Sequence, residues 1–215
     1  EIVLNNKEKN YVIEEKDIER YLGKEKYTLM NTNYKNTVGI VNALSYTNLG
    51  GEVLKIEVNI YKGTGKIITT GLLGDVFKES TQIALSYIKS NCDILKVDFD
   101  LLNNIDIHLH VPEGAVRKDG PSAGISITTA IVSALKNKQI SSYLALTGEI
   151  TLRGNILPVG RIKEKIMGAK LNNIKKIILP KDNEKDVEVL DEQLKKDIKF
   201  VYVSNYDEVI KEIKI

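Results

Sequence analysis

The sequence has one cysteine, no tryptophan and no long apolar run. Because Cys92 is alone among 215 residues, the chain can form neither an internal disulfide nor a cysteine-based metal cluster. No segment approaches the ~18 apolar residues of a membrane-spanning helix, and the first residues lack a signal-peptide pattern. The 31 basic and 29 acidic residues give a net charge of +2, which is too balanced to indicate nucleic-acid binding. We expect a soluble globular protein that binds neither nucleic acid nor membrane.

Histidine is almost as scarce, and the positions of its two copies exclude one familiar kind of active site. Residues 118–124 read KDGPSAG and contain the G-x-S-x-G pattern of the nucleophile elbow in α/β-hydrolases. In that triad a histidine follows the serine, but His108 and His110 both precede Ser122. If Ser122 is a nucleophile, it therefore needs a different base.

The same two histidines alternate with apolar residues over residues 105–111, which predicts a strand with His108 and His110 on one face. A zinc site needs at least a third protein ligand, and Glu113 is the nearest candidate. Its spacing is not that of a metal site, so we favour exposed or hydrogen-bonded histidines near the active site. We expect no bound metal.

A buried helix is predicted to begin at the serine. Pro121 suits a first turn because its φ is fixed and it has no N–H group. The apolar positions that follow lie nearly all round the helix: Ile125, Ile127, Ala130, Ile131, Val132, Ala134 and Leu135. Backbone N–H groups at its start, around residues 120–123, could stabilise an oxyanion, and Gly120 and Gly124 would let a substrate backbone approach. In the alternative interpretation, Ser122 only caps the helix.

Lys165 is the candidate base. The apolar positions around it step by three and four, which is the spacing of one helix face: Val159, Ile162, Ile166 and Ala169. If the amine cannot reach water, burial lowers its pKa. A neutral lysine can then accept the proton of a serine hydroxyl, as in Ser-Lys dyads. The alternative is a lysine that snorkels, with its ammonium in water.

An ordered series of segments resembles a known family. Residues 108–115 read HLHVPEGA and precede KDGPSAG at 118–124; TGEITLRG follows at 147–154, LPVG at 157–160 and IKEK at 162–165. With this series the chain resembles the proteolytic domain of Lon, an ATP-dependent serine protease, from about residue 37 to the C-terminus. The GPSAG and KEK forms resemble the A-type branch of that family rather than its membrane-associated B-type branch.

The resemblance implies roles for particular residues. Ser122 would be the nucleophile, Lys165 the general base, and Thr147 a residue that positions this dyad, with Gly120 and Asp119 in support. The implied substrates are unfolded or damaged proteins and peptides, delivered by an ATPase ring that is usually a hexamer. The implied location is the cytoplasm or, alternatively, the mitochondrial matrix. A rival function is a non-enzymatic ring-assembly module whose dyad is inactive in isolation.

Two positions depart from the family pattern. A glycine usually stands where this chain has Arg161, and Ser126 replaces the usual threonine or alanine. Neither belongs to the implied dyad, but the arginine could alter the packing or the rim of the cleft.

The N-terminal part has a different character. Residues 14–22 predict a helix stopped by Gly23, and residues 31–36 form a polar linker. The resemblance implies that residues 1–33 are the tail of an upstream AAA-type ATPase module plus a linker, and that residues 34–215 are the proteolytic domain. No G-x-x-x-x-G-K-[ST] phosphate loop is present, and GTGK at 63–66 predicts a hairpin turn. We expect no cofactor in this chain, and ATP with Mg²⁺ only in the full-length protein.

Strands are predicted at residues 37–46, 52–61, 66–72, 105–111, 144–146, 176–179 and 200–203. Further helices are predicted around residues 76–87 and at 184–190 and 206–213. This order indicates an α+β fold, with a mixed sheet and helices packed on it, rather than a regular doubly wound sheet.

Overall fold

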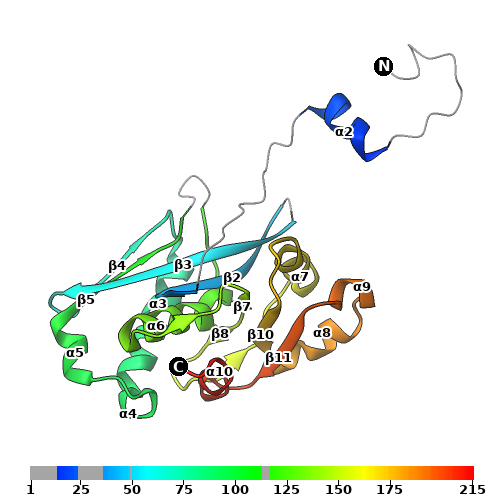
Figure 1. Ribbon diagram of the computed structural model, residues 1–215. Helices are drawn as coiled ribbons and strands as arrows, with labels where there is room; N and C mark the ends of the chain where they lie inside the picture. Colours follow the sequence, from blue (N-terminus) through cyan, green and yellow to red (C-terminus); the bar gives the residue numbers. More distant parts are fainter. Residues whose placement is uncertain (1–13, 24–35, 49, 113–116) are drawn as a thin grey trace, which may run out of the picture. The chain divides into compact units, whose positions relative to one another are not determined.

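The computed structural model describes residues 14–23, 36–48, 50–112 and 117–215 (Figure 1). The chain divides into two units, Glu1–Thr32 and Asn33–Ile215. In the first unit, helix α2 (Glu15–Leu22) begins with a capping box between Glu14 and Asp17 and ends at Gly23, whose φ is 82°. This confirms the helix predicted for residues 14–22. None of the helices in the described ranges is long and apolar enough to cross a membrane.

The second unit is built on one seven-stranded sheet. Its strands are β2 (Ile40–Thr47), β3 (Gly50–Lys62), β4 (Ile67–Thr70), β5 (Ile105–His110), β7 (Leu144–Leu146), β10 (Lys176–Pro180) and β11 (Lys199–Val203). Their order is β11-β10-β7-β2-β3-β5-β4. The pairs from β11 to β2 are parallel, β3 is antiparallel to both its neighbours, and β4 is parallel to β5. The sheet is therefore mixed and the fold is α+β, as predicted.

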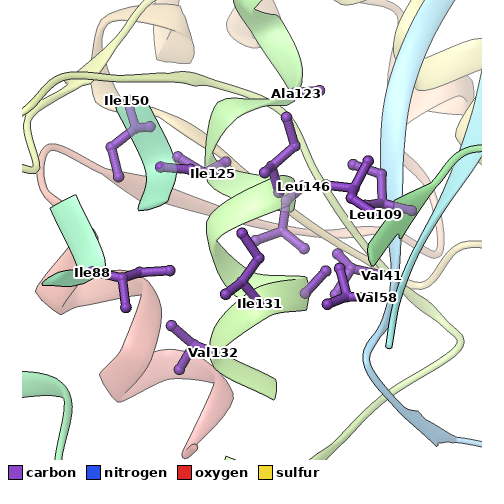
Figure 2. Packing of buried hydrophobic residues seen from close by; sticks show 14 of the residues in the cluster. Val41, Val58, Ile88, Leu109, Ala123, Ile125, Ile131, Val132, Leu146 and Ile150 are labelled. Atoms are coloured by element: carbon purple, nitrogen blue, oxygen red, sulfur yellow. The ribbon is translucent and has the colours of Figure 1, made fainter. Parts of the chain in front are cut away.

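Helices cover both faces of this sheet (Figure 1). Helices α3 (Asp75–Ser90), α6 (Gly124–Lys136) and α10 (Tyr206–Ile213) contribute to one apolar core, and α7 (Ile162–Leu171), α8 (Glu184–Glu188) and α9 (Glu192–Lys195) to another. Successive strand residues alternate between the two cores, since Ala43 faces the first and Leu44 the second. Figure 2 shows the first core, where Ile125 and Ile131 of α6 lie among residues of the sheet and of α3.

The remaining elements are short. They are α4 (Cys92–Leu95), α5 (Phe99–Asn104), the pairs β1 (Thr37–Val38) with β6 (Gln139–Ile140) and β8 (Glu149–Ile150) with β9 (Ile156–Leu157), and the 3₁₀ turns η1 (Pro121–Ala123) and η2 (Lys181–Asn183). The strand predicted for residues 37–46 is divided between β1 and β2 at Gly39, whose φ is 73°. A Cβ there would overlap the carbonyl oxygen of Val58, so only glycine fits this crossing of two backbones.

The predicted hairpin at residues 63–66 is wrong. Strand β5 lies between β3 and β4, so the turn carries the chain across the end of β5. Asp106 of β5 binds this turn: its carboxylate accepts N–H bonds from Thr64 at 2.8 Å and Lys66 at 3.0 Å. These bonds lower the pKa of Asp106. The same two amides are thus occupied, so this GTGK turn is no cradle for a phosphate.

Helix α7 rests directly on strand β3 at two glycines. A Cβ on Gly51 would overlap the carbonyl group of Glu164, and a Cβ on Gly168 would overlap the carbonyl group of Gly51. No side chain separates the two backbones at this point. The contact therefore fixes how close α7, and every residue it carries, can lie to the sheet.

We predict that Gly168→Ala destabilises the domain by about 1–3 kcal/mol, because the added methyl group overpacks the contact with β3. The direction of the change in unfolding free energy is informative. Alanine in a helix interior is otherwise more favourable than glycine by up to about 1 kcal/mol. Urea unfolding measures the difference. Gly160→Ala is the matched control, because no atom lies within 4 Å of its added Cβ. A Gly168→Ala variant that is as stable as the wild type, or more stable, would contradict the close backbone contact between α7 and β3.

Candidate active site

Ser122 lies in the turn η1, immediately before helix α6. Gly120 begins this turn with φ 122° and ψ 158°, a conformation that residues with a side chain rarely adopt. Pro121 opens the turn as predicted, but the α-helix itself starts only at Gly124. Ser122 is half-buried, and its hydroxyl makes no hydrogen bond to any described residue. The capping interpretation of Ser122 is therefore wrong.

The backbone of Ser122 is fixed by the segment that follows β7. The N–H group of Gly148 donates to the Ser122 carbonyl oxygen at 2.8 Å, and the Thr147 hydroxyl approaches the same oxygen at 3.3 Å. Ile125 returns a bond to the Gly148 carbonyl at 3.1 Å. Gly124 adds a close approach, since a Cβ there would lie 2.8 Å from the backbone nitrogen of Ile150. Gly124 thus serves internal packing, not the approach of substrate that we predicted for it.

Asp119 holds the loop before the turn. Its Oδ1 accepts N–H bonds from Phe77 and from Gly120, each at 3.0 Å. Phe77 lies in the first turn of α3, whose own cap residue, Gly74, has no side chain to offer. Asp119 therefore caps α3 from a distant segment and ties that helix to Gly120. In the described residues it makes no hydrogen bond or ion pair with the side chain of Ser122 or Lys165.

Lys165 is buried in the first turns of α7, with 2% of its surface exposed. Its Nζ donates to Thr147 Oγ1 at 2.9 Å, and no carboxylate among the described residues forms an ion pair with it. Burial lowers the pKa of this amine from 10.5 to about 8. The snorkelling alternative is therefore wrong, and a substantial fraction of Lys165 is neutral in mildly alkaline solution.

Thr147 lies between the two candidate catalytic residues. Its hydroxyl accepts a hydrogen bond from Lys165 and can donate one to the Ser122 carbonyl, and its own N–H group donates to Ile178 of β10 at 3.1 Å. Ser122 and Lys165 are thus held by the same residue, although no hydrogen bond joins their side chains in the described structure. The arrangement places a nucleophile candidate near a desolvated amine with a lowered pKa.

His108 and His110 serve the sheet. Thr70 Oγ1 lies 3.0 Å from Nε2 of His108 and 2.7 Å from Nδ1 of His110, within hydrogen-bond distance of both rings. No set of three potential metal ligands occurs in the described ranges. Glu113, the predicted third ligand, lies outside them. The hydrogen bonds match one part of our preferred interpretation, and a location of the two histidines near the active site stays a prediction.

Arg161 precedes α7 in the left-handed region, with φ 61°, which explains why glycine suits this position. Its guanidinium lies 5.5 Å from the centre of the Tyr46 ring and 3.5 Å from the Glu164 carboxylate. The arginine thus packs along the outer surface at the start of α7. Ser126, the other departure, is buried and donates to the Leu146 carbonyl at 3.0 Å.

Sequence reasoning missed the residues that assemble this site from a distance. It gave no role to Gly148, Gly51 or Gly168, although a Thr-Gly pair directly after a short buried strand was a usable signal for a chain reversal. The two glycines that seat α7 lie more than 100 positions apart in the sequence. No local pattern connects them.

The fold presents a candidate hydrolase site. Thr147, directly after a strand of the mixed sheet, is bonded both to the half-buried Ser122 and to the buried Lys165. Residues 12–215 match the family model described as Lon protease (S16) C-terminal proteolytic domain. The chain belongs to this family.

Curated relatives agree with this assignment. The Lon protease of Dictyoglomus thermophilum is 45% identical over 199 residues, which cover 93% of this chain and 25% of that protein. Lon protease 1 of Bacillus subtilis is 45% identical over 208 residues, covering 97% and 27% respectively. The Lon protease of Bacillus thuringiensis is 46% identical over 209 residues, covering 97% and 26%. The chain thus spans about a quarter of the length of these relatives.

We predict that Lys165→Met stabilises the domain near pH 7 and that this advantage shrinks as the pH rises. The folded-state pKa of about 8 lies below the ordinary 10.5, so between these values the unfolded wild type binds more protons than the folded one. Wild-type stability therefore rises across this window, by at most about 3 kcal/mol. Urea unfolding of both proteins at pH 7 and 10.5 measures the change. A pH-independent difference would contradict a buried, desolvated Lys165.

Proposed function

We propose that this chain is the proteolytic part of an ATP-dependent serine endopeptidase, with Ser122 as nucleophile and Lys165 as general base. The observation that carries the proposal is the buried Lys165 amine, bonded to Thr147 at 2.9 Å and with its pKa lowered to about 8 by desolvation. Serine has no histidine partner here, because both histidines bond to Thr70 on β4. Lysine is therefore the available base.

The reaction follows from these positions. Neutral Lys165 takes the proton of the Ser122 hydroxyl as Oγ attacks the scissile carbonyl carbon. Protonated Lys165 then gives this proton to the departing amine, which leaves an acyl-enzyme. Lys165 next accepts a proton from the water that attacks the ester, and returns it to Ser122 Oγ as the acyl–oxygen bond breaks and the carboxylic acid product leaves. Thr147 accepts a hydrogen bond from Lys165 throughout and keeps its amine on the side of the serine.

The oxyanion needs N–H donors at the start of α6. Gly120 N–H already donates to Asp119 Oδ1, and Pro121 has no N–H group. Within the predicted stretch from Gly120 to Ala123, we therefore assign the main donor to the backbone N–H of Ser122 itself. It lies at the beginning of the η1–α6 segment, where helical N–H groups lack intrahelical partners.

For the wider role, we propose for this chain the activity that the names of its relatives state. We infer that its substrates are unfolded or damaged proteins and peptides, that it works in a hexameric ring, and that it does so in the cytoplasm. Residues 1–33 remain a predicted tail of the ATPase module. The GTGK turn offers no free amides for a phosphate, since the N–H groups of Thr64 and Lys66 bond to Asp106. ATP and Mg²⁺ would bind elsewhere in the full-length protein.

We predict that Ser122→Ala abolishes peptide cleavage and costs about 1 kcal/mol of stability or less, because the lost hydroxyl makes no hydrogen bond in the described structure. Hydrolysis of an unstructured fluorogenic peptide measures the loss of cleavage, and thermal unfolding measures the change in stability. A peptide boronate or phosphonate should label wild type and spare the variant. Absence of labelling in the wild type would favour the ring-assembly module. Proteolysis by a folded Ser122→Ala variant would refute the assignment of Ser122 as the nucleophile.

We predict that Lys165→Arg is inactive although it retains the positive charge, because arginine stays protonated and cannot act as a base. In wild type, kcat/KM should rise with pH through about 8, where Lys165 loses its proton. Peptide hydrolysis between pH 6 and 10 measures the profile. Substantial activity in the Lys165→Arg variant, or a kcat/KM that does not change with pH, would show that Lys165 has only a structural role.

A further inference from the structure

Asn183 makes an unusual set of contacts with the segment that leads into α7. It ends the turn η2 and is 3% exposed. Its Oδ1 accepts the N–H bond of Val159 at 2.9 Å, and its Nδ2 donates to the carbonyl of the same residue at 3.0 Å. One side chain thus satisfies both backbone groups of Val159, as a neighbouring strand would.

Asp186 fixes the orientation of this amide. Its Oδ2 lies 2.6 Å from Nδ2 of Asn183. A carboxylate only accepts hydrogen bonds, so it requires the NH₂ group of Asn183 on its side, and Oδ1 must face the Val159 N–H. Both amide hydrogens are then used, one toward Asp186 and one toward Val159. The amide therefore has one arrangement that satisfies all its partners.

Besides the Asn183 amide, the segment is held by the Val159 side chain, which packs against the second core. Pro158 and Gly160 are exposed, and Val159 is half-buried. A cavity of about 690 Å³ lies beside it, lined by Pro158, Asn183 and charged residues of η2 and α8. Solvent rather than side chains thus borders this segment on the cavity side.

Three residues after Val159, the chain enters α7 at Ile162. The first turn is closed by the bond from Lys165 N–H to the Arg161 carbonyl at 3.0 Å. The start of the helix therefore sets where the Lys165 backbone lies, while Gly51 and Gly168 fix the helix further along. A shift at Val159 would tilt this first turn and carry Lys165 with it.

We propose that Asn183 is a positioning residue that anchors Val159 and thereby holds Lys165 in its buried place beside Thr147. This inference rests on the proposed function, in which Lys165 acts on Ser122. Asn183 touches no reacting atom and acts only through the segment 159–161.

The test compares Asn183→Ala and Asn183→Asp with Val187→Ala. The aspartate keeps an acceptor for the Val159 N–H but loses the donor and sets a second carboxylate against Asp186. Val187 lies in α8, is 2% exposed and belongs to the same core as α7. Its truncation destabilises this region and leaves the amide contacts in place.

Two measurements are made on each protein. The first is the NMR titration of the Lys165 Cε resonance in protein carrying ¹³C-lysine, assigned with Lys165→Met. The second is peptide hydrolysis. In both Asn183 variants we expect the Lys165 midpoint to rise from about 8 toward 10.5 as the amine gains water. At pH 7.5 we expect kcat to fall about tenfold with KM nearly unchanged.

Val187→Ala should lower the melting temperature and leave the midpoint unmoved. The inference is overturned if the Asn183 variants lose thermal stability but keep both the wild-type midpoint and kcat, or if Val187→Ala shifts the midpoint equally. A different result would refute the proposed function alone. In that case the wild type hydrolyses no peptide, while the midpoint of the Lys165 titration still shifts only in the Asn183 variants. Asn183 would then position Lys165 for some other purpose.

Discussion

Helix α7 and strand β3 meet backbone to backbone at Gly168 and Gly51, and the rest of the site depends on this contact. A larger residue at either position would hold the helix away from the sheet. Lys165 lies on α7 between Ile162 and Ile166, which belong to the second core, and its Nζ reaches Thr147, the residue directly after β7. The separation of two backbones thus decides whether this amine is buried or solvated.

The burial of Lys165 changes its chemistry because its partner is neutral. A carboxylate at the same distance would stabilise the ammonium and keep the pKa high. The threonine hydroxyl accepts one hydrogen bond and supplies no charge, so desolvation dominates and the pKa falls to about 8. The domain loses stability at neutral pH by holding a lysine here, and gains an amine that can be neutral.

The serine is fixed by the same segment that receives the lysine. Thr147 and Gly148 both bond to the Ser122 carbonyl, while Asp119 ties the preceding loop to the first turn of α3. The site therefore draws on α3, α6, α7 and β7. Relative movement of any one of them would separate the two side chains.

Local sequence patterns predicted much of this fold. Alternation over residues 105–111 gave β5, and the spacing of Ile162, Ile166 and Ala169 placed Lys165 on a buried helix face. Both are properties of neighbouring residues, which the sequence displays directly. The hairpin at residues 63–66 failed because β5 lies between β3 and β4, and its residue Asp106, about 40 positions away, binds the turn.

Contacts between a side chain and a distant backbone escaped prediction for the same reason. Asp119 reaches an amide 42 positions away and Asn183 a carbonyl 24 positions away. In the sequence, each is an ordinary polar residue in a polar stretch. The two glycines that seat α7 have no periodicity at all, since they matter only where two backbones cross.

A crystal structure of the chain with a peptide boronate bound to Ser122 tests the central claim most directly. The boronate oxygens imitate the tetrahedral intermediate and show where the reacting groups lie. We predict that Lys165 Nζ then lies within about 3.2 Å of Ser122 Oγ or of a boronate oxygen, still bonded to Thr147. A Lys165 that stays buried but lies well beyond hydrogen-bond reach of the adduct would contradict its role as the base.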